Sequence, residues 1–178
     1  MKPNLLKTQR LILRKSSSLD ALPLFQSYFS NQESARFLTR KPHQDVEQTK
    51  KILHKWCDEP WNVEREKFGW VLASRKTNKP IGIFLVEIED QKAQIHYGIA
   101  NEFTGQGIIV EAGEAVVQWL ANKKILQQIW AVCDTANISS KKVLEKLNFK
   151  NEGIFKERLY FPSYGEARDC FYFSISLY

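Results

Sequence analysis

Long hydrophobic runs are missing from this sequence of 178 residues. No stretch approaches the roughly 18 consecutive apolar residues that a membrane-spanning helix needs, and residues 1–7 lack the apolar core and cleavage site of a secretory signal peptide. Cysteines are also few, because only Cys57, Cys133 and Cys170 occur, far apart and in a number that suits neither a disulfide framework nor a zinc pattern. We therefore expect a cytoplasmic protein with no membrane partner and no metal site.

Internal repeats, low-complexity segments and runs of five or six like charges are absent as well. The net charge of +6 comes from Lys and Arg residues spread along the chain, and it favours partners that carry phosphate groups. RNA binding is an alternative reading of the charge, although aromatic platforms in a recognisable order are lacking. The length and the hydrophobic share of 43% fit one globular domain spanning residues 1–178.

Hydrophobic periodicity predicts strands and helices in mixed order. Strands are expected at residues 8–14, 68–74, 80–88, 94–99, 127–133, from 149 onward and at 168–177, and helices at 19–29, 31–38, 46–56, 108–121 and after 137. Short turns connect the strands at 68–74, 80–88 and 94–99, which indicates an antiparallel meander. This pattern predicts an α+β fold around one mixed sheet.

Two glycines one residue apart, Gly105 and Gly107, lie between the strand at 94–99 and the helix at 108–121. Unpaired N–H groups and the positive end of the helix dipole meet at such a point, which makes it a ready phosphate site. A dinucleotide fingerprint would need a third glycine where Val110 stands, and no Gly-Lys-Ser/Thr sequence of a P-loop follows. The alternative is a tight turn that only glycine fits.

The segment Thr104, Gly105, Gln106, Gly107, Ile108, Ile109 resembles the acyl-CoA loop of the GNAT superfamily of N-acetyltransferases, Gln/Arg-x-x-Gly-x-Gly/Ala. The central glycine matches, whereas Thr104 and Ile109 depart from the pattern. A bulky apolar residue in the last place is familiar in the branch that resembles the ribosomal-protein (alanine/serine) N-acetyltransferases. The sequence Thr-x-Arg-Leu-x-Leu-Arg at residues 8–14 also resembles the N-terminus of that branch.

A second motif lies near residue 140. Asn137 and Ser140 match the family's Asn-x-x-Ser, and Leu-Asn-Phe at 147–149 stands where the family has Leu-Gly-Phe. The resemblance therefore covers almost the whole chain. It implies a GNAT-like mixed, mostly antiparallel sheet of about seven strands, flanked by about four helices, with a splay between the central strands.

The resemblance also implies an activity, the transfer of an acetyl group from acetyl-CoA to a primary amine by direct attack. Residues Thr104, Gly105, Gln106, Gly107, Ile108 and Ile109 would hold the pyrophosphate of the cosubstrate. The strand with Ile95 and Tyr97 would offer backbone N–H to the acetyl carbonyl oxygen. Asn137 would bind the pantetheine arm, and Ser140 would return a proton to the departing thiolate. The alternative for Asn137 and Ser140 is a helix N-cap with its first-turn partner.

The general base is less clearly marked. Many relatives place a glutamate where this chain has Gln94, whose amide cannot take a proton. The ribosomal-protein branch uses a glutamate on the strand after Asn-x-x-Ser, and that place is held by Leu159, with Glu157 one strand period earlier. His96 shares a face with Gln94 and has an ordinary pKa near 6.5, which makes it the other candidate. The alternatives are a solvated carboxylate for Glu157 and a hydrogen-bonded core imidazole for His96.

The lack of a marked base bears on the acceptor. An α-amine with a pKa near 8 needs about 1 kcal/mol to become neutral at pH 7.4, whereas a lysine with a pKa near 10.4 needs about 4 kcal/mol. A protein N-terminus is therefore the favoured acceptor, and the resemblance to the ribosomal-protein branch implies a ribosomal protein as the candidate partner. A small amine such as a polyamine or an aminoglycoside is one alternative, and a non-catalytic acyl-CoA-binding module is another. Both a monomer and a homodimer are compatible with the sequence.

Overall fold

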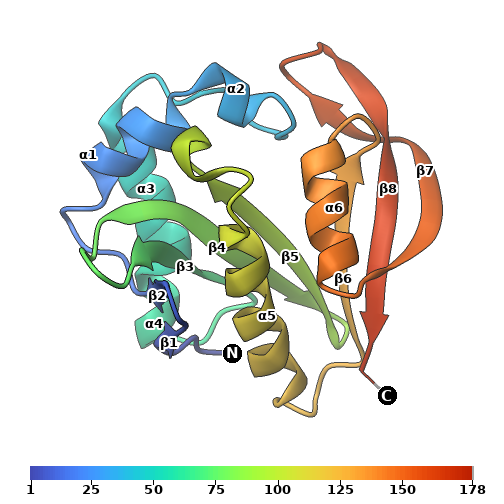
Figure 1. The fold of residues 1–178 in the computed structure, drawn as a ribbon, viewed down its shortest axis with the longest axis horizontal. Coiled ribbons are helices and arrows are strands. Elements are labelled where there is room, and N and C mark those ends of the chain that lie inside the picture. Colours follow the sequence, from blue (N-terminus) through green and yellow to red (C-terminus); the bar gives the residue numbers. More distant parts are fainter. Residues whose placement is uncertain (178) are drawn as a thin grey trace.

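The computed structural model describes residues 1–177, which build one eight-stranded sheet in the order β1-β2-β3-β4-β5-β6-β8-β7 (Figure 1). The strands are β1 (Leu6–Lys7), β2 (Leu11–Arg14), β3 (Lys67–Ser74), β4 (Pro80–Glu89), β5 (Lys92–Ile99), β6 (Gln128–Asp134), β7 (Lys150–Phe161) and β8 (Glu166–Ser176). The helices are α1 (Ala21–Leu24), the π-helical η1 (Phe25–Phe29), α2 (Gln32–Ala35), α3 (Val46–Cys57), α4 (Glu59–Asn62), the 3₁₀ turn η2 (Asn101–Phe103), α5 (Ile108–Ala121) and α6 (Ile138–Lys146). Over residues 1–177, no helix is long and apolar enough to cross a membrane.

The predicted fold class is confirmed. The sheet is mixed, with β5 and β6 parallel and the other neighbouring strands antiparallel. The meander predicted from the short turns is the run β3-β4-β5. The strand beyond the expected seven is β1, a two-residue strand that is too short to show a periodic pattern. The predicted strand at 8–14 begins only at Leu11, because the Thr8 N–H bonds to the Leu11 carbonyl in a turn.

The sheet separates two hydrophobic cores, because neighbouring residues of a strand point to opposite faces. Trp70 belongs to the core under α5, where its ring meets Trp119 with the centroids 5.4 Å apart. The next residue, Val71, belongs to the core under α1, η1 and α3, together with Leu53. Figure 1 shows α5 and α6 on one side of the sheet and α3 on the other. The packing of Trp119 thus fixes α5 against the central strands.

The central strands β5 and β6 pair only where they begin. Their parallel pairing runs from Lys92–Gln128 to Gln94–Trp130, and the two strands then diverge (Figure 1). Beyond this point β5 stays paired with β4 as far as Ile99, and β6 stays paired with β8 as far as Asp134. The splay that the resemblance implies is therefore present in the structure.

His43 ties the segment before α3 to the core under that helix. Its ring stacks on Phe29 with the centroids 4.7 Å apart, and its Nδ1 atom lies 2.8 Å from the Thr49 hydroxyl oxygen. Burial, assisted by the positive charge of Arg40, lowers the pKa of the His43 imidazole from 6.5 to about 4. The folded protein therefore holds a neutral imidazole at pH values where an unfolded chain would be protonated.

We predict that the free energy of unfolding decreases as the pH falls from 6.5 towards 4. Between these values the unfolded chain takes up a proton that the buried His43 does not, so protonation favours unfolding. The loss due to this group is at most about 3 kcal/mol, and the group contributes nothing further to the pH dependence above 6.5. Urea unfolding at pH 7, 5.5 and 4 measures the effect. His43→Phe keeps the stack on Phe29 and should show a smaller loss, and an equal loss would rule out His43 as the titrating group.

Candidate active site

The splay opens a cleft with a volume of about 730 Å³, which we call the splay cleft. Its walls come from β5, β6, the start of α5 and the inner face of α6. Two further segments complete it, residues 37–39 after α2 and the end of β7 at Leu159 and Phe161. A volume in this range is typical of sites that enclose a small molecule or a cofactor.

Most of the site residues predicted from the sequence lie together in the splay cleft. The predicted residues among its lining are Ile95, His96, Tyr97, Thr104, Gly105, Gly107, Ile108, Ile109, Asn137 and Ser140. Gln106 and Glu157 are not among the lining residues. The side chain of Gln106 folds back on the preceding turn, where its Nε2 donates to the Glu102 carbonyl at 2.8 Å.

Glu157 lies outside the cleft because β7 bulges around it. Phe155 pairs with Cys170 and Leu159 pairs with Arg168, so β7 advances by four residues while β8 advances by two. Glu157 has a φ of 46°, and its side chain is exposed. Strand alternation does not continue through such a bulge. The reason for choosing Glu157, a shared face with Leu159, therefore does not hold.

The segment around Gly105 and Gly107, between η2 and α5, has the geometry of an anion site, and we call it the glycine loop. Gly105 and Gly107 have φ values of 75° and 73°, in the left-handed region that glycine adopts without strain. Gly107 is the N-cap of α5 and offers no side chain to cap it, so the first-turn N–H groups remain for a ligand. Lys142 and Lys146 of α6 also line the splay cleft and add positive charge.

Ser140 and Tyr97 form a hydroxyl pair inside the splay cleft. Their oxygens lie 2.8 Å apart, and either can donate. Burial raises the pKa of the Tyr97 phenol well above its usual value, so the phenol keeps its proton at neutral pH. From the sequence, only the backbone N–H of Tyr97 was expected to take part. Its hydroxyl was missed because contact between β5 and α6 leaves no local signal in the sequence.

Asn137 and Asp134 fix the turn that leads from β6 into α6. The Oδ1 atom of Asn137 accepts the Ser140 N–H at 3.0 Å, so the alternative reading of Asn137 as an N-cap is confirmed. Only its Nδ2 group remains to donate to a ligand. Asp134 is fully buried and accepts from the Arg168 Nε at 2.6 Å and from the Ala136 N–H at 2.7 Å.

Two other titratable side chains of the cleft are His96 and Cys133. The His96 ring is accessible to solvent but surrounded by the cleft walls, and this partial removal from water lowers its pKa despite the nearby Glu87 carboxylate. Burial raises the pKa of the Cys133 thiol to about 11. At neutral pH the imidazole is therefore neutral and can accept a proton, whereas the thiol is a poor nucleophile.

The splay cleft also has an apolar wall, whose residues were not predicted as site residues from the sequence. Phe37 and Leu38 line the same cleft as Leu159 and Phe161 from the other half of the chain. The two halves are joined by the Arg36 Nε, which donates to the Tyr164 hydroxyl at 3.0 Å. These residues carry no motif, and only the folded chain brings them together.

Comparisons with known proteins agree with this geometry. Residues 10–150 match the family model of the acetyltransferase (GNAT) domain. The uncharacterized N-acetyltransferase p20 of Bacillus licheniformis is 27% identical over 173 residues, which cover 96% of this chain and 94% of that relative.

Two solved structures are similar over nearly their whole length. RimL, a ribosomal L7/L12 alpha-N-protein acetyltransferase in complex with coenzyme A, has a TM-score of 0.84 at 19% identity, covering 97% of this chain and 98% of that chain. The ribosomal-protein-S5-alanine acetyltransferase of Vibrio fischeri has a TM-score of 0.82 at 22% identity, covering 98% of this chain and 97% of that chain. At these identities the structures show the fold alone. Since the family model spans most of the chain, the protein belongs to the GNAT family of N-acetyltransferases, with acetyl-CoA as its cosubstrate.

Proposed function

We propose that the protein acetylates the N-terminal α-amine of a protein. The charge of the splay cleft is the observation that carries this proposal. Among the described residues that line it, the only carboxylate belongs to Asp134, which is buried against Arg168. A polyamine or an aminoglycoside carries several positive charges and needs free carboxylates to bind. A peptide N-terminus presents a single amine and has no such requirement.

The available base agrees with this acceptor. His96 is neutral at pH 7 because its pKa is lowered, and by strand alternation it shares the face of Gln94. An imidazole can take a proton from an α-amine directly or through one water. Removing the proton from a lysine ammonium would cost about 3 kcal/mol more at the same pH. Two of the similar structures are named as ribosomal-protein acetyltransferases, so a ribosomal protein is the first acceptor to test.

The remaining steps fall to residues that line the splay cleft. The Thr104 N–H is taken up by the Asn101 carbonyl, so the backbone N–H groups of residues 105–109 are the ones that would bind the pyrophosphate. The Asn137 amide would hold the pantetheine arm. The edge of β5 around Ile95 and Tyr97, which has left β6, donates backbone N–H to the acetyl carbonyl oxygen as it becomes negative. When the tetrahedral centre collapses, the hydroxyl pair of Ser140 and Tyr97 returns a proton to the thiolate.

We predict that Ser140→Ala lowers kcat by about 100-fold or more, as expected for the loss of a general acid. The assay is the release of the CoA thiol from acetyl-CoA with a panel of peptide N-termini, ribosomal proteins and small amines. Ser139→Ala removes the neighbouring hydroxyl of α6 and is the matched control, with a change of less than about threefold. Acetylation of lysine side chains in preference to α-amines would contradict the acceptor assignment. CoA binding without turnover on any amine would leave a non-catalytic binding module.

The pH profile should identify the base. We predict that kcat/KM declines at acidic pH, because the His96 imidazole becomes protonated and can no longer accept a proton. Partial burial lowers the pKa of His96, so the decline should lie at a lower pH than an ordinary imidazole would give. In His96→Gln this decline should disappear together with most of the activity. Glu157→Gln should keep both the activity and the profile, since Glu157 lies outside the cleft. The opposite result, with Glu157→Gln inactive and His96→Gln active, would transfer the role to Glu157.

Direct attack makes a prediction about Cys133. With a pKa of about 11 its thiol is protonated at neutral pH, so it should not take the acetyl group from acetyl-CoA. Mass spectrometry of the intact protein after mixing with acetyl-CoA, without an acceptor, should show no acetyl adduct. A thioester on Cys133 that disappears when an amine is added would instead indicate a two-step transfer through the enzyme.

A further inference from the structure

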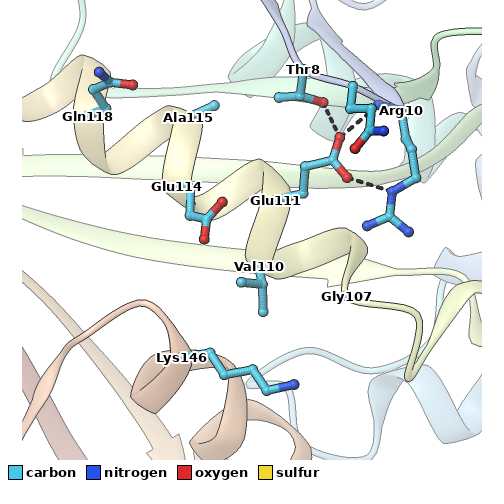
Figure 2. A pocket seen from close by; sticks show the side chains of 10 residues that line it. Thr8, Arg10, Gly107, Val110, Glu111, Glu114, Ala115, Gln118 and Lys146 are labelled. Atoms are coloured by element: carbon cyan, nitrogen blue, oxygen red, sulfur yellow. Dashed lines mark hydrogen bonds and ion pairs between the residues drawn. The ribbon is translucent and has the colours of Figure 1, made fainter.

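The carboxylate of Glu111 joins the first turn of α5 to the turn between β1 and β2. It accepts the Thr8 hydroxyl at 2.5 Å, the Arg10 backbone N–H at 2.8 Å and the Arg10 Nε at 2.6 Å (Figure 2). The segments are separated by about a hundred residues of sequence. These contacts lie beside a second cavity, which shares Gly107, Val110 and Lys146 with the splay cleft.

Arg10 also reaches the glycine loop itself. Its Nη1 donates to the backbone carbonyl of Gln106 at 2.9 Å. In a planar trans peptide the C=O and the following N–H point in opposite directions. Holding the Gln106 carbonyl towards Arg10 therefore directs the Gly107 N–H away from Arg10. Because glycine flanks Gln106 on both sides, this peptide has more rotational freedom than most, and a fixed partner restricts it.

We propose that Arg10 and Glu111 are positioning residues that hold the glycine loop in its phosphate-binding orientation. This role rests on the proposed binding of the pyrophosphate by residues 105–109. Glu111 anchors the guanidinium, and the guanidinium anchors the Gln106 carbonyl. Neither side chain touches the reacting atoms, so both act through the loop.

The charges of this pair fit the same role. Burial alone would raise the pKa of the Glu111 carboxyl, but the bonds from Thr8 and Arg10 outweigh burial and lower it. Glu111 is therefore ionised, and Arg10 neutralises a negative charge that would otherwise stand close to the phosphates. The Arg10 side chain is 46% exposed and does not belong to either hydrophobic core, so its loss should affect the loop more than the stability of the fold.

Binding of CoA and of pantetheine to Arg10→Ala, measured by calorimetry, tests the proposal without any acceptor. Pantetheine has the thiol arm of CoA but lacks the pyrophosphate. We expect the Kd for CoA to rise about tenfold and the Kd for pantetheine to change less than twofold. With acetyl-CoA, KM should rise about tenfold while kcat changes less than twofold. In NMR spectra the amide resonance of Gly107 should shift in the unliganded variant.

Two further variants separate position from charge and from general damage. Arg10→Lys keeps the positive charge, but one ammonium group cannot bond Glu111 and the Gln106 carbonyl with the same fork geometry, so it should bind CoA as weakly as Arg10→Ala. Arg65→Ala removes a similarly exposed arginine, paired with Glu59, that lines neither cavity, and should bind CoA like the wild type.

Four outcomes would overturn the proposal. An unchanged Kd for CoA in Arg10→Ala would show that the loop needs no such anchor, while leaving the acetyltransferase function intact. Equal weakening for CoA and pantetheine would indicate general damage to the cleft, and full rescue by Arg10→Lys would indicate charge alone. If the wild-type protein bound neither CoA nor acetyl-CoA, the proposed function and the positioning role would both fail.

Discussion

The end of pairing between β5 and β6, after Gln94 and Trp130, is the constraint on which the site depends. Backbone N–H and C=O groups in a protein interior need hydrogen-bond partners. Beyond the splay, β5 keeps such partners on β4, and β6 keeps them on β8. The edges that separate are therefore exposed to a cleft. Helix α5 follows β5 after the turn η2 and the glycine loop, and α6 follows β6 after a short turn, so both helix N-termini lie at the open end of the splay. The gap that interrupts the sheet thus supplies the donors that a phosphate or a carbonyl oxygen can use.

Features encoded over short distances could be predicted from the sequence. The meander β3-β4-β5 follows from alternating residues and short turns, and α5 follows from its helical periodicity. The two glycines indicated the left-handed loop because few other residues adopt such angles easily. Asn137 indicated the start of α6 because asparagine is a preferred N-cap residue, and its side chain does cap that helix. The splay, in contrast, was expected from the resemblance to a family.

Features that depend on tertiary contacts could not be predicted. The bulge in β7 places Glu157 at a positive φ, a conformation that a glutamate does not indicate. The bulge also interrupts the strand alternation from which Glu157 was predicted to face the cleft. The Tyr97–Ser140 pair and the bond from Arg10 to Gln106 join segments more than forty residues apart. Hydrophobic packing of Trp119 on Trp70 sets the position of α5. The direction of the loop's donors depends on polar bonds, which carry no periodic signal.

The composition of the splay cleft bears on how the enzyme would select an acceptor. Its walls are apolar at Phe37, Leu38 and Phe161, and its described carboxylate is already paired with Arg168. Such a cleft offers a cationic amine little attraction, so the neutral form of the amine has to bind or be generated inside the cleft, where we propose His96 as the base. The cost of that step rises with the pKa of the amine and differs by about 3 kcal/mol between an α-amine and a lysine, a factor of more than about 100 in rate. Proton affinity alone can therefore favour a protein N-terminus over its lysines, before any contact with the rest of the acceptor is considered.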